Sequence, residues 1–149
     1  PYAREPRPGI ISAGQPRGHE WRSLAEAGVE RVLDIRERWE PRGHDEAKAV
    51  VAAGLRYENV PFGHGHVPAA TFERVRELMR ENSGAPIVVH CASGNRVGAA
   101  LIPWWILDEG LSEDEALQAA VAAGLASRGL AVVALEYARR VGKEKEVAA

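Results

Sequence analysis

The feature that most constrains the fold is a short apolar run just before the only cysteine of the chain. Residues 87–89 are apolar and β-branched, which is typical of a fully buried strand, and residues 99–107 continue as a mostly apolar helix. Cys91 is therefore predicted to lie at a turn between a buried strand and a helix. A cysteine in such a place is often only a small core residue, so the residues that follow it decide its role.

The six residues from Cys91 to Arg96 have a composition that suits an anion-binding turn. Gly94 allows the backbone to curl, and Arg96 offers a planar fork for two oxygens of an oxyanion. Successive backbone N–H groups can point into one concavity, with the positive end of the next helix behind them. The same field favours the thiolate form of Cys91 and makes it a nucleophile. The residues expected to contact the anion are Ala92, Ser93, Gly94, Asn95 and Arg96.

The composition limits the classes of protein to which the chain can belong. A chain of 149 residues is long enough for one domain with its own core, and a net charge of −2 argues against a general nucleic-acid binder. No apolar run reaches the length of a membrane span, and one cysteine cannot form an internal disulfide. We expect one domain over residues 1–149, with residues 1–8 and 143–149 as flexible ends. The cytoplasm is the favoured compartment, but an exported form stays open because the sequence begins at Pro1 without a methionine.

Strand and helix patterns alternate along the chain. Strands are predicted at residues 9–12, 29–35, 55–60 and 87–89. Helices are predicted at residues 19–27, 45–53, 68–82, 96–109, 112–123 and 130–141. This order predicts an α/β fold, a three-layer sandwich in which helices cover both faces of a mostly parallel central sheet.

The cysteine turn also resembles a known signature. Residues 90–96 are similar to the His-Cys-x-x-Gly-x-x-Arg motif of protein tyrosine and dual-specificity phosphatases, with one residue fewer before the arginine. The shorter spacing resembles a bacterial branch of that superfamily, related to the beta-lactamase-hydrolase-associated phosphatase-like domains. Residues 11–16, 32–36 and 54–61 resemble the same branch, so the similarity spans about residues 9–125.

The resemblance implies a cysteine-dependent phosphatase that works in two steps without a metal or another cofactor. The family cysteine, here Cys91, attacks phosphorus to form a phosphocysteine, and the family arginine, here Arg96, binds the phosphoryl oxygens together with the loop amides. The partner implied is a phosphorylated substrate, either a phosphotyrosine protein or a small phosphomonoester, and the oligomeric state stays open. The residues that the resemblance places around the pocket are Gln15, Asp34 and Arg36, with His90 supporting the loop from behind.

Two positions depart from the family pattern. Phosphatases of this type usually carry an aspartate, as general acid, in the loop that corresponds to residues 61–68, but this loop has no carboxylate. His64 or His66 could donate the proton instead, since imidazolium is a competent acid. A solvated Gly-His loop is an equally good interpretation. Val97 stands where many relatives have serine or threonine, so slow turnover or a shifted substrate is expected.

Two other functions stay open on the sequence. Rhodanese-type sulfurtransferases also use a six-residue loop that begins with cysteine, and residues 34–40 with Gly43-His44 resemble an early rhodanese segment. Cys91 would then carry sulfur as a persulfide. Residues 110–116, however, lead into helices, as in phosphatases, and not into the strand and Gly-Gly turn of rhodaneses. The third possibility is a catalytically silent module that binds phosphate or a phosphopeptide, which the missing acid and Val97 would favour.

Overall fold

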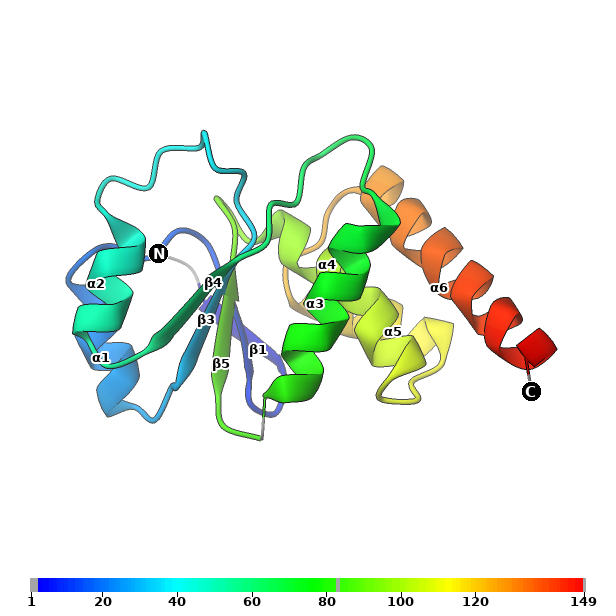
Figure 1. Ribbon diagram of the computed structural model, residues 1–149, viewed down its shortest axis with the longest axis horizontal. Helices are drawn as coiled ribbons and strands as arrows, with labels where there is room; N and C mark the ends of the chain where they lie inside the picture. The colour runs from blue at the N-terminus through cyan, green and yellow to red at the C-terminus, as the bar shows by residue number, and fades with distance from the viewer. Residues whose placement is uncertain (1–2, 83, 149) are drawn as a thin grey trace.

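The computed structural model describes residues 3–82 and 84–148, and its centre is a five-stranded sheet (Figure 1). The strands are β1 (Ala3–Arg7), β2 (Ile10–Ala13), β3 (Arg31–Asp34), β4 (Arg56–Asn59) and β5 (Ile87–His90). Their order across the sheet is β1-β2-β5-β3-β4. β1 pairs antiparallel with β2, and all other neighbours pair in parallel. The predicted mostly parallel sheet is confirmed.

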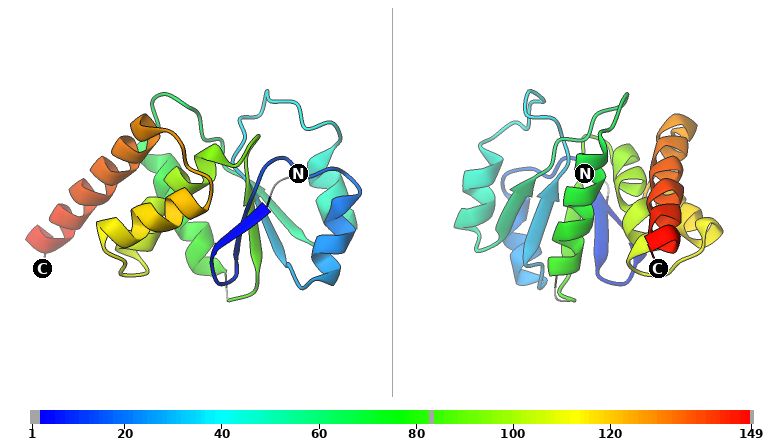
Figure 2. Two further views of the ribbon diagram at one scale, coloured as in Figure 1. Left: turned by 180° about the vertical axis from the view of Figure 1, so that it is seen from behind. Right: turned by 45° about the vertical axis from the view of Figure 1, so that its right-hand side comes forward.

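Helices cover both faces of this sheet (Figures 1 and 2). They are α1 (Glu20–Glu26), α2 (Glu46–Ala52), α3 (Ala69–Glu81), α4 (Asn95–Leu107), α5 (Glu113–Ala122) and α6 (Arg128–Ala148). α1 and α2 cover one face, over a core that includes Trp21 and Val50, and α3 to α6 lie on the other side around a larger core that includes Phe72 and Leu101. The predicted three-layer α/β architecture is confirmed. Of the helices in the described parts of the chain, none combines the length and the apolar character needed to cross a membrane.

β5 is the central strand, and all its residues are buried, as its sequence predicts. Val88 belongs to the core under α1 and α2, and Val89 belongs to the larger core on the other face. The parallel register places Ala13 of β2 and Asp34 of β3 opposite His90 of β5. The segments that follow these three strands therefore meet at one edge of the sheet, which is where open parallel sheets build their sites.

The predicted flexible ends, residues 1–8 and 143–149, carry secondary structure over most of their described part. Residues 3–7 form β1, which is largely exposed and pairs with β2 through its backbone. A charged segment of this kind has no apolar alternation, so the sequence gives no sign of the strand. Residues 143–148 continue α6, and the lysines and glutamates there are good helix formers. The same prediction for residues 1–2 and 149 lies outside the described residues.

Gly98 lets α4 and α5 pack backbone to backbone. A Cβ atom at this position would lie 2.5 Å from the carbonyl oxygen of Ala120. Every residue of α4 from Arg96 to Trp105 is buried, so this helix is enclosed on all sides. α5 thus braces the first turns of α4, the helix that begins directly after the cysteine turn.

Candidate active site

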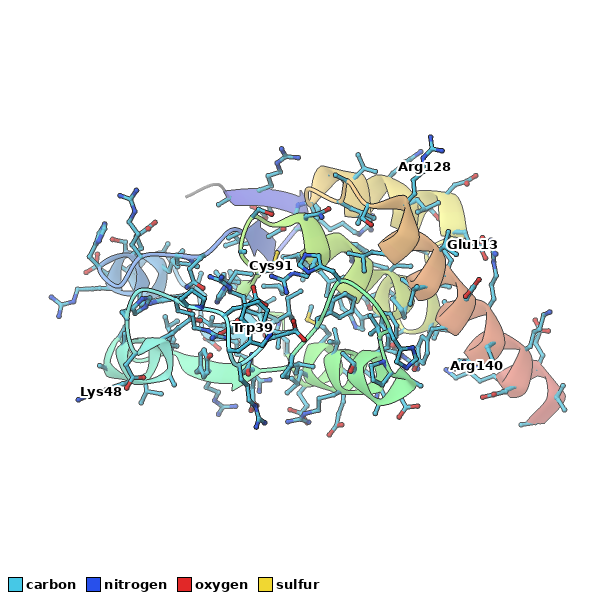
Figure 3. All side chains as sticks on the ribbon, turned by 90° about the horizontal axis from the view of Figure 1, so that it is seen from above. Trp39, Lys48, Cys91, Glu113, Arg128 and Arg140 are labelled. Atoms are coloured by element: carbon cyan, nitrogen blue, oxygen red, sulfur yellow. The ribbon has the colours of Figure 1, made fainter. Side chains whose placement is uncertain are left out.

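The turn between β5 and α4 holds the cysteine at the floor of the site. Gly94 has a left-handed backbone with φ of 93°, and its N–H donates to Cys91 Sγ at 3.1 Å. A backbone N–H aimed at the sulfur stabilises a thiolate. Cys91 itself is 1% exposed, whereas Ala92 and Ser93 are exposed at the surface of the turn. This is the strand-to-helix placement that the sequence predicts, and Figure 3 shows it from above.

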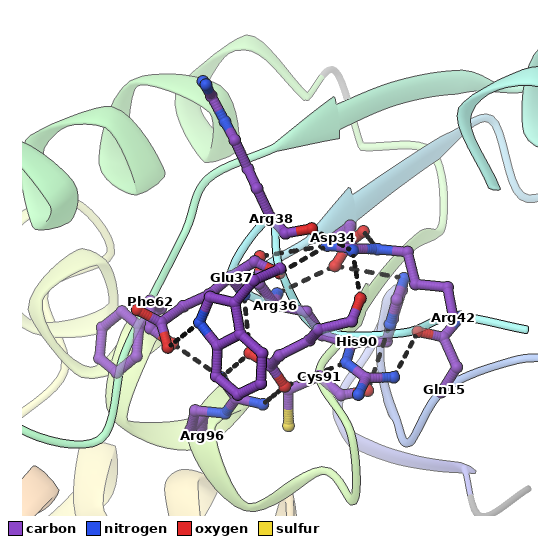
Figure 4. Close-up of polar contacts among 12 residues, drawn as sticks. Gln15, Asp34, Arg36, Glu37, Arg38, Arg42, Phe62, His90, Cys91 and Arg96 are labelled. Atoms are coloured by element: carbon purple, nitrogen blue, oxygen red, sulfur yellow. Dashed lines mark hydrogen bonds and ion pairs between the residues drawn. The ribbon is translucent and has the colours of Figure 1, made fainter. Parts of the chain in front are cut away.

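Arg96 is buried behind the turn and held by three hydrogen bonds (Figure 4). It donates from Nη1 to Glu40 Oε2 (2.8 Å) and to the carbonyl oxygen of Phe62 (2.9 Å), and from Nη2 to Glu40 Oε1 (2.8 Å). A guanidinium has five N–H donors, so two remain, one on Nε and one on Nη2. These two donors lie along the same edge. The Glu40 carboxylate thus occupies the Nη1–Nη2 edge and leaves the Nε–Nη2 edge for a second oxyanion.

The electrostatics of Arg96 link it to both the carboxylate and the sulfur. Burial by itself would lower the pKa of the guanidinium. The hydrogen bond with Glu40 and the charge of the Cys91 sulfur outweigh burial and raise the pKa of Arg96 above its ordinary value. Arg96 therefore stays charged beside the sulfur, and the edge that Glu40 leaves open is the one available to Cys91 and to a bound anion.

Glu40 is one of two buried glutamates of this site that the sequence analysis missed. It is 7% exposed, and besides Arg96 its carboxylate accepts from Arg36 Nε (3.1 Å) and from the N–H of Glu37 (2.7 Å). The hydrogen bond from Arg96 outweighs the opposing effect of burial and lowers the pKa of Glu40 to about 2. The one signal available was its place in the polar segment that follows a strand next to β5. No spacing rule connects a loop glutamate with an arginine so far along the chain.

His90 is buried directly behind the cysteine. Its Nε2 donates to Glu46 Oε2 at 2.6 Å, and its Nδ1 lies 3.3 Å from the carbonyl oxygen of Cys91. Glu46 comes from the first turn of α2, is 2% exposed, and accepts from Gln15 through its other oxygen. This placement agrees with the supporting role that the resemblance implies for His90. Glu46, its buried partner, is the second glutamate that the sequence analysis missed.

Asp34, Arg36 and Gln15 lie around the turn, at the ends of β3 and β2. Asp34 Oδ2 accepts from the hydroxyl of Tyr57 and from Arg42 Nε, each at 2.6 Å, and Oδ1 accepts from the N–H of Arg36 at 2.9 Å. Burial and the hydrogen bond to Asp34 raise the pKa of Tyr57. Arg36 Nη1 donates to Gln15 Oε1 at 3.0 Å. The structure therefore brings these three predicted residues into one hydrogen-bonded network beside the cysteine turn.

Asp34, Glu46 and His90 also have the spacing of a cation site. One ligand atom from each lies within 4.8 Å of the other two. Every carboxylate oxygen of this group, however, already accepts a hydrogen bond from a protein donor, and the histidine nitrogen donates to Glu46. Polar groups that are satisfied in this way form a stable buried network on their own. The network accounts for the three residues without a metal ion.

Two contacts from other segments hold the shape of the turn. The N–H of Gln15 donates to the carbonyl oxygen of Ala92 at 3.0 Å, and Gly14 packs so closely that a Cβ atom there would lie 3.0 Å from the same oxygen. On the opposite side, Asn95 Oδ1 accepts from the N–H of Ala126 at 2.7 Å. The Asn95 side chain therefore points toward the connection between α5 and α6, and its backbone N–H is the group that it can offer to an anion.

The loop formed by residues 61–68 reaches the site through its backbone. Phe62 is buried, and its carbonyl oxygen accepts from Arg96. His64 and His66 are both exposed, and His66 lines a hollow of about 220 Å³ between α3 and α6. The Glu37 carboxylate lies beside this loop, since a Cβ atom on residue 63 would be 3.3 Å from Glu37 Oε1. A carbonyl group of the loop thus enters the site, while His66 is turned toward α6.

Solved structures of phosphatases share the fold. A DUF442 protein from Shewanella putrefaciens CN-32 is 21% identical, covers 93% of this chain and 91% of its own, and superposes with a TM-score of 0.77. Tk-PTP in its active form is 18% identical over 94% of this chain and 98% of its own, with a TM-score of 0.79. PTPMT1 is 17% identical over 97% of this chain and 99% of its own, with a TM-score of 0.79. At these identities the likeness supports the fold.

The family follows from the sequence itself. No curated protein matches the chain. A family model described as "Polymorphic toxin system, DSP-PTPase phosphatase" (Tc-R-P) matches residues 7–110, which include the whole cysteine turn. The predicted resemblance to the tyrosine and dual-specificity phosphatases is confirmed by this match, which favours it over the rhodanese alternative. Because the match covers well over half of the sequence, the protein belongs to the DSP-PTPase phosphatase family.

Proposed function

We propose that the protein is a cysteine-dependent phosphatase that hydrolyses phosphomonoesters. The observation that carries this proposal is the open edge of the Arg96 guanidinium beside the sulfur of Cys91. Two parallel donors on that edge, together with the N–H groups of the turn, complement the equatorial oxygens of a phosphoryl group. The same positive field favours a thiolate nucleophile. Membership of the phosphatase family supports this activity.

The proposed reaction has two steps. The Cys91 thiolate forms a bond to phosphorus while the bond from phosphorus to the leaving oxygen breaks, and a general acid protonates that oxygen. Water then attacks the phosphocysteine, the phosphorus–sulfur bond breaks, and inorganic phosphate and the thiolate are released. Arg96 and the N–H groups of the turn bind the equatorial oxygens throughout. Glu40 holds the guanidinium of Arg96 in this orientation by binding its Nη1–Nη2 edge.

We propose a histidine of the loop at residues 61–68 as the general acid, since this loop has no carboxylate. Because His66 lines the hollow beside α6, His64 is the first of the two to test. Val97 cannot supply the hydroxyl that stabilises the departing thiolate in many relatives, so breakdown of the phosphocysteine should be slow. Modest turnover is therefore part of this proposal.

Phosphotyrosine proteins and small phosphomonoesters are the substrate classes that we propose. A cysteine-to-serine variant of P. aeruginosa TpbA, which is 18% identical over 86% of this chain with a TM-score of 0.67, has been solved in complex with pTyr. PTPMT1 has been solved in complex with PI(5)P. These two ligands show that the shared fold accommodates both an aryl and an inositol phosphate, and they are the first two substrates to compare.

The test is hydrolysis of an aryl phosphate beside sulfur transfer from thiosulfate to cyanide, with the wild-type protein and Cys91→Ser. We expect phosphate release that disappears in Cys91→Ser and persists in Ser23→Ala, a change at an exposed position of α1 that removes only a hydroxyl. Cys91-dependent thiocyanate formation without phosphate release would instead support a sulfurtransferase, which the six-residue turn favours. Binding of phosphate without either reaction would support a silent binding module.

A further inference from the structure

The side-chain amide of Gln15, in the segment just after β2, lies between two groups of opposite charge. Its Oε1 accepts from Arg36 Nη1 at 3.0 Å, and its Nε2 donates to Glu46 Oε1 and to the carbonyl oxygen of Pro16. An amide can accept from a guanidinium and donate to a carboxylate at the same time. An ionised carboxylate has no hydrogen to donate, and an ammonium group has no acceptor. The two charged neighbours therefore fix which way the amide of Gln15 faces.

One of these neighbours leads to the guanidinium of Arg96 (Figure 4). Arg36 Nε donates to Glu40 Oε1 at 3.1 Å, and each oxygen of that carboxylate accepts from Arg96 at 2.8 Å. Arg36, Glu40 and Arg96 are all buried, with at most 8% of each residue exposed. Through its oxygen, Gln15 is thus joined to the pair of charges that orients Arg96.

The other neighbour leads to the backbone of Cys91. Glu46 Oε2 accepts from His90 Nε2 at 2.6 Å, and His90 Nδ1 lies 3.3 Å from the carbonyl oxygen of Cys91. The main chain of Gln15 contacts the same turn, since its N–H donates to the carbonyl oxygen of Ala92 at 3.0 Å. The side-chain contacts form one continuous path, which runs through Arg96, Glu40, Arg36, Gln15, Glu46, His90 and Cys91.

We propose that Gln15 is a positioning residue whose amide couples the orientation of Arg96 to that of the Cys91 carbonyl group. Its role in positioning rests on the proposed phosphatase function, whereas the coupling is a property of the network itself. Hydrogen bonds in a buried network orient and polarise one another, so a change at one carboxylate reaches the other through the groups between them. A second route, through Asp34, is weaker because its Oδ1 lies 3.9 Å from His90 Nε2, too far for a hydrogen bond.

The first test is a double-mutant cycle that combines Glu40→Gln with Glu46→Gln. The dissociation constant of inorganic phosphate would be measured by calorimetry in two backgrounds, the wild-type protein and Gln15→Met, whose new side chain has a similar length and lacks the amide. With Gln15 in place, we expect the combined effect of the two glutamate changes to differ at least about threefold from the product of their separate effects. In the Gln15→Met background, the combined effect should equal that product. Equal departures in both backgrounds, or none in either, would overturn the coupling.

Gln15→Met by itself should weaken phosphate binding about threefold to tenfold, because two hydrogen bonds to charged groups are lost. Gln118→Met is the matched control, since it makes the same change at an exposed position of α5, and it should leave binding unchanged. Gln15→Met keeps the backbone contact with the turn, so its effect reports on the side chain alone. Should Gln15→Met fail to fold, Gln15→Glu takes its place, because it keeps the acceptor for Arg36 and lacks the donor for Glu46. Unchanged phosphate binding in the folded variant would contradict the positioning role.

A second test needs no bound anion. The chain has five histidines, all within the described residues, and His90 is the only one of them that is buried. Its ring nitrogens, followed by nitrogen-15 NMR, report on the far end of the path from Arg96. We expect Glu40→Gln to shift these resonances, and the shift to fall by at least about half in the Gln15→Met background. Glu58→Gln, at an exposed position of β4, is the control and should cause no shift. A shift of the same size in both backgrounds would show that the amide does not carry the coupling.

The two tests distinguish this inference from the proposed function. If the folded wild-type protein neither binds phosphate nor hydrolyses a phosphomonoester, the phosphatase proposal fails, and the second test still decides whether Gln15 couples the two carboxylates. If phosphate binds, but the cycle is additive and the His90 resonances do not respond to Glu40→Gln, the coupling is wrong while the proposed function stands.

Discussion

Glu40 determines which edge of the buried Arg96 guanidinium is left open toward the cysteine turn. An arginine behind the turn could offer either of two edges to an anion, and the carboxylate fixes the choice by taking one of them. The same carboxylate also accepts from Arg36 and from a backbone N–H, so its own position is fixed from three sides. Lysine could not reproduce this arrangement, since it has no second edge to present.

Glu40→Gln tests this role through both activity and stability. Without the charged partner, Arg96 loses its fixed orientation, and we expect kcat/KM for an aryl phosphate to fall at least about tenfold. A carboxyl with a pKa of about 2 when folded and 4.5 when unfolded contributes on the order of 3 kcal/mol to folding. Its folded-state pKa is depressed, so the contribution is fully present above pH 4.5 and is lost as the pH falls toward 2.

The stability difference between the wild-type protein and Glu40→Gln should therefore be largest at neutral pH and shrink in acid, as measured by urea unfolding. The matched control is Glu58→Gln, because Glu58 makes only an exposed ion pair with Arg74 at 3.7 Å. Such pairs contribute little, so this variant should keep its activity and its stability. If both variants behaved alike, the orienting role of Glu40 would be ruled out.

The identity of the general acid can be tested with leaving groups of different basicity. Phenyl phosphate needs a proton on its leaving oxygen, whereas dinitrophenyl phosphate does not. If His64 is the acid, His64→Gln should slow phenyl phosphate about 100-fold and leave dinitrophenyl phosphate nearly unchanged, and the wild-type rate with phenyl phosphate should fall as the pH rises. His66→Gln is the matched control. Equal losses on both substrates, or none in either variant, would exclude these histidines from proton transfer.

Site residues could be predicted from the sequence where the residues that act together are close neighbours in the chain. Cys91, Gly94 and Arg96 lie within one turn, and the turn was recognisable from its composition alone. Glu40 and Glu46 were missed because their partners are distant in the sequence and meet them only through the parallel register of the sheet. Charged residues in polar segments usually face solvent, so nothing marked these two as buried.

At the scale of elements, the position of α4 depends on its contact with α5. The absence of a side chain at Gly98 allows the two backbones to touch, which holds the start of α4 and with it the cysteine turn. Alanine is normally a better helix former than glycine, so helix propensity and packing make opposite predictions for a substitution here. The distance of 2.5 Å from a new Cβ atom to a backbone carbonyl oxygen makes packing the stronger effect.

Gly98→Ala should therefore lower the free energy of unfolding by about 1–3 kcal/mol, because two helices must move apart. Gly142→Ala is the matched control, since residue 142 also lies in a helix and its added Cβ atom would meet only Leu107 Cδ2 at 3.9 Å. That variant should be neutral or more stable by about 0.5–1 kcal/mol. Thermal unfolding of both variants would settle the comparison, and a stable Gly98→Ala would contradict the close packing.

The elements that the sequence predicted correctly are those with a clear apolar period or cap. β5 was recognised from its β-branched run, and α3 from one apolar face that includes Phe72 and Leu78. β1 was missed because its pairing depends on backbone hydrogen bonds with β2 and not on its charged side chains. The helical extension of α6 was missed because its last turns contact little of the core and show no apolar stripe.

For the whole molecule, an anion bound in the turn should stabilise the fold, because the unfolded chain has no such site. At 100 times the dissociation constant, phosphate or tungstate should add about 2.7 kcal/mol, which corresponds to a rise in melting temperature of roughly 5–10 °C. Sodium chloride at equal ionic strength is the control for general screening. Cys91→Ser should keep the effect and Arg96→Lys should lose most of it. An equal rise with sodium chloride would refute specific binding.

The contacts that hold the site join residues far apart in the sequence, and this separation determines how late in folding the site can form. The hydrogen bonds between Glu40 and Arg96 close a loop of 56 residues, and the one between Glu46 and His90 closes a loop of 44. Contacts of such high contact order form late, after the loss of chain entropy has been offset by the growing core. In a growing or partly folded chain Arg96 is therefore unrestrained. Its orientation beside Cys91 is set only in the last cooperative step of folding, together with the sheet that brings the two segments close.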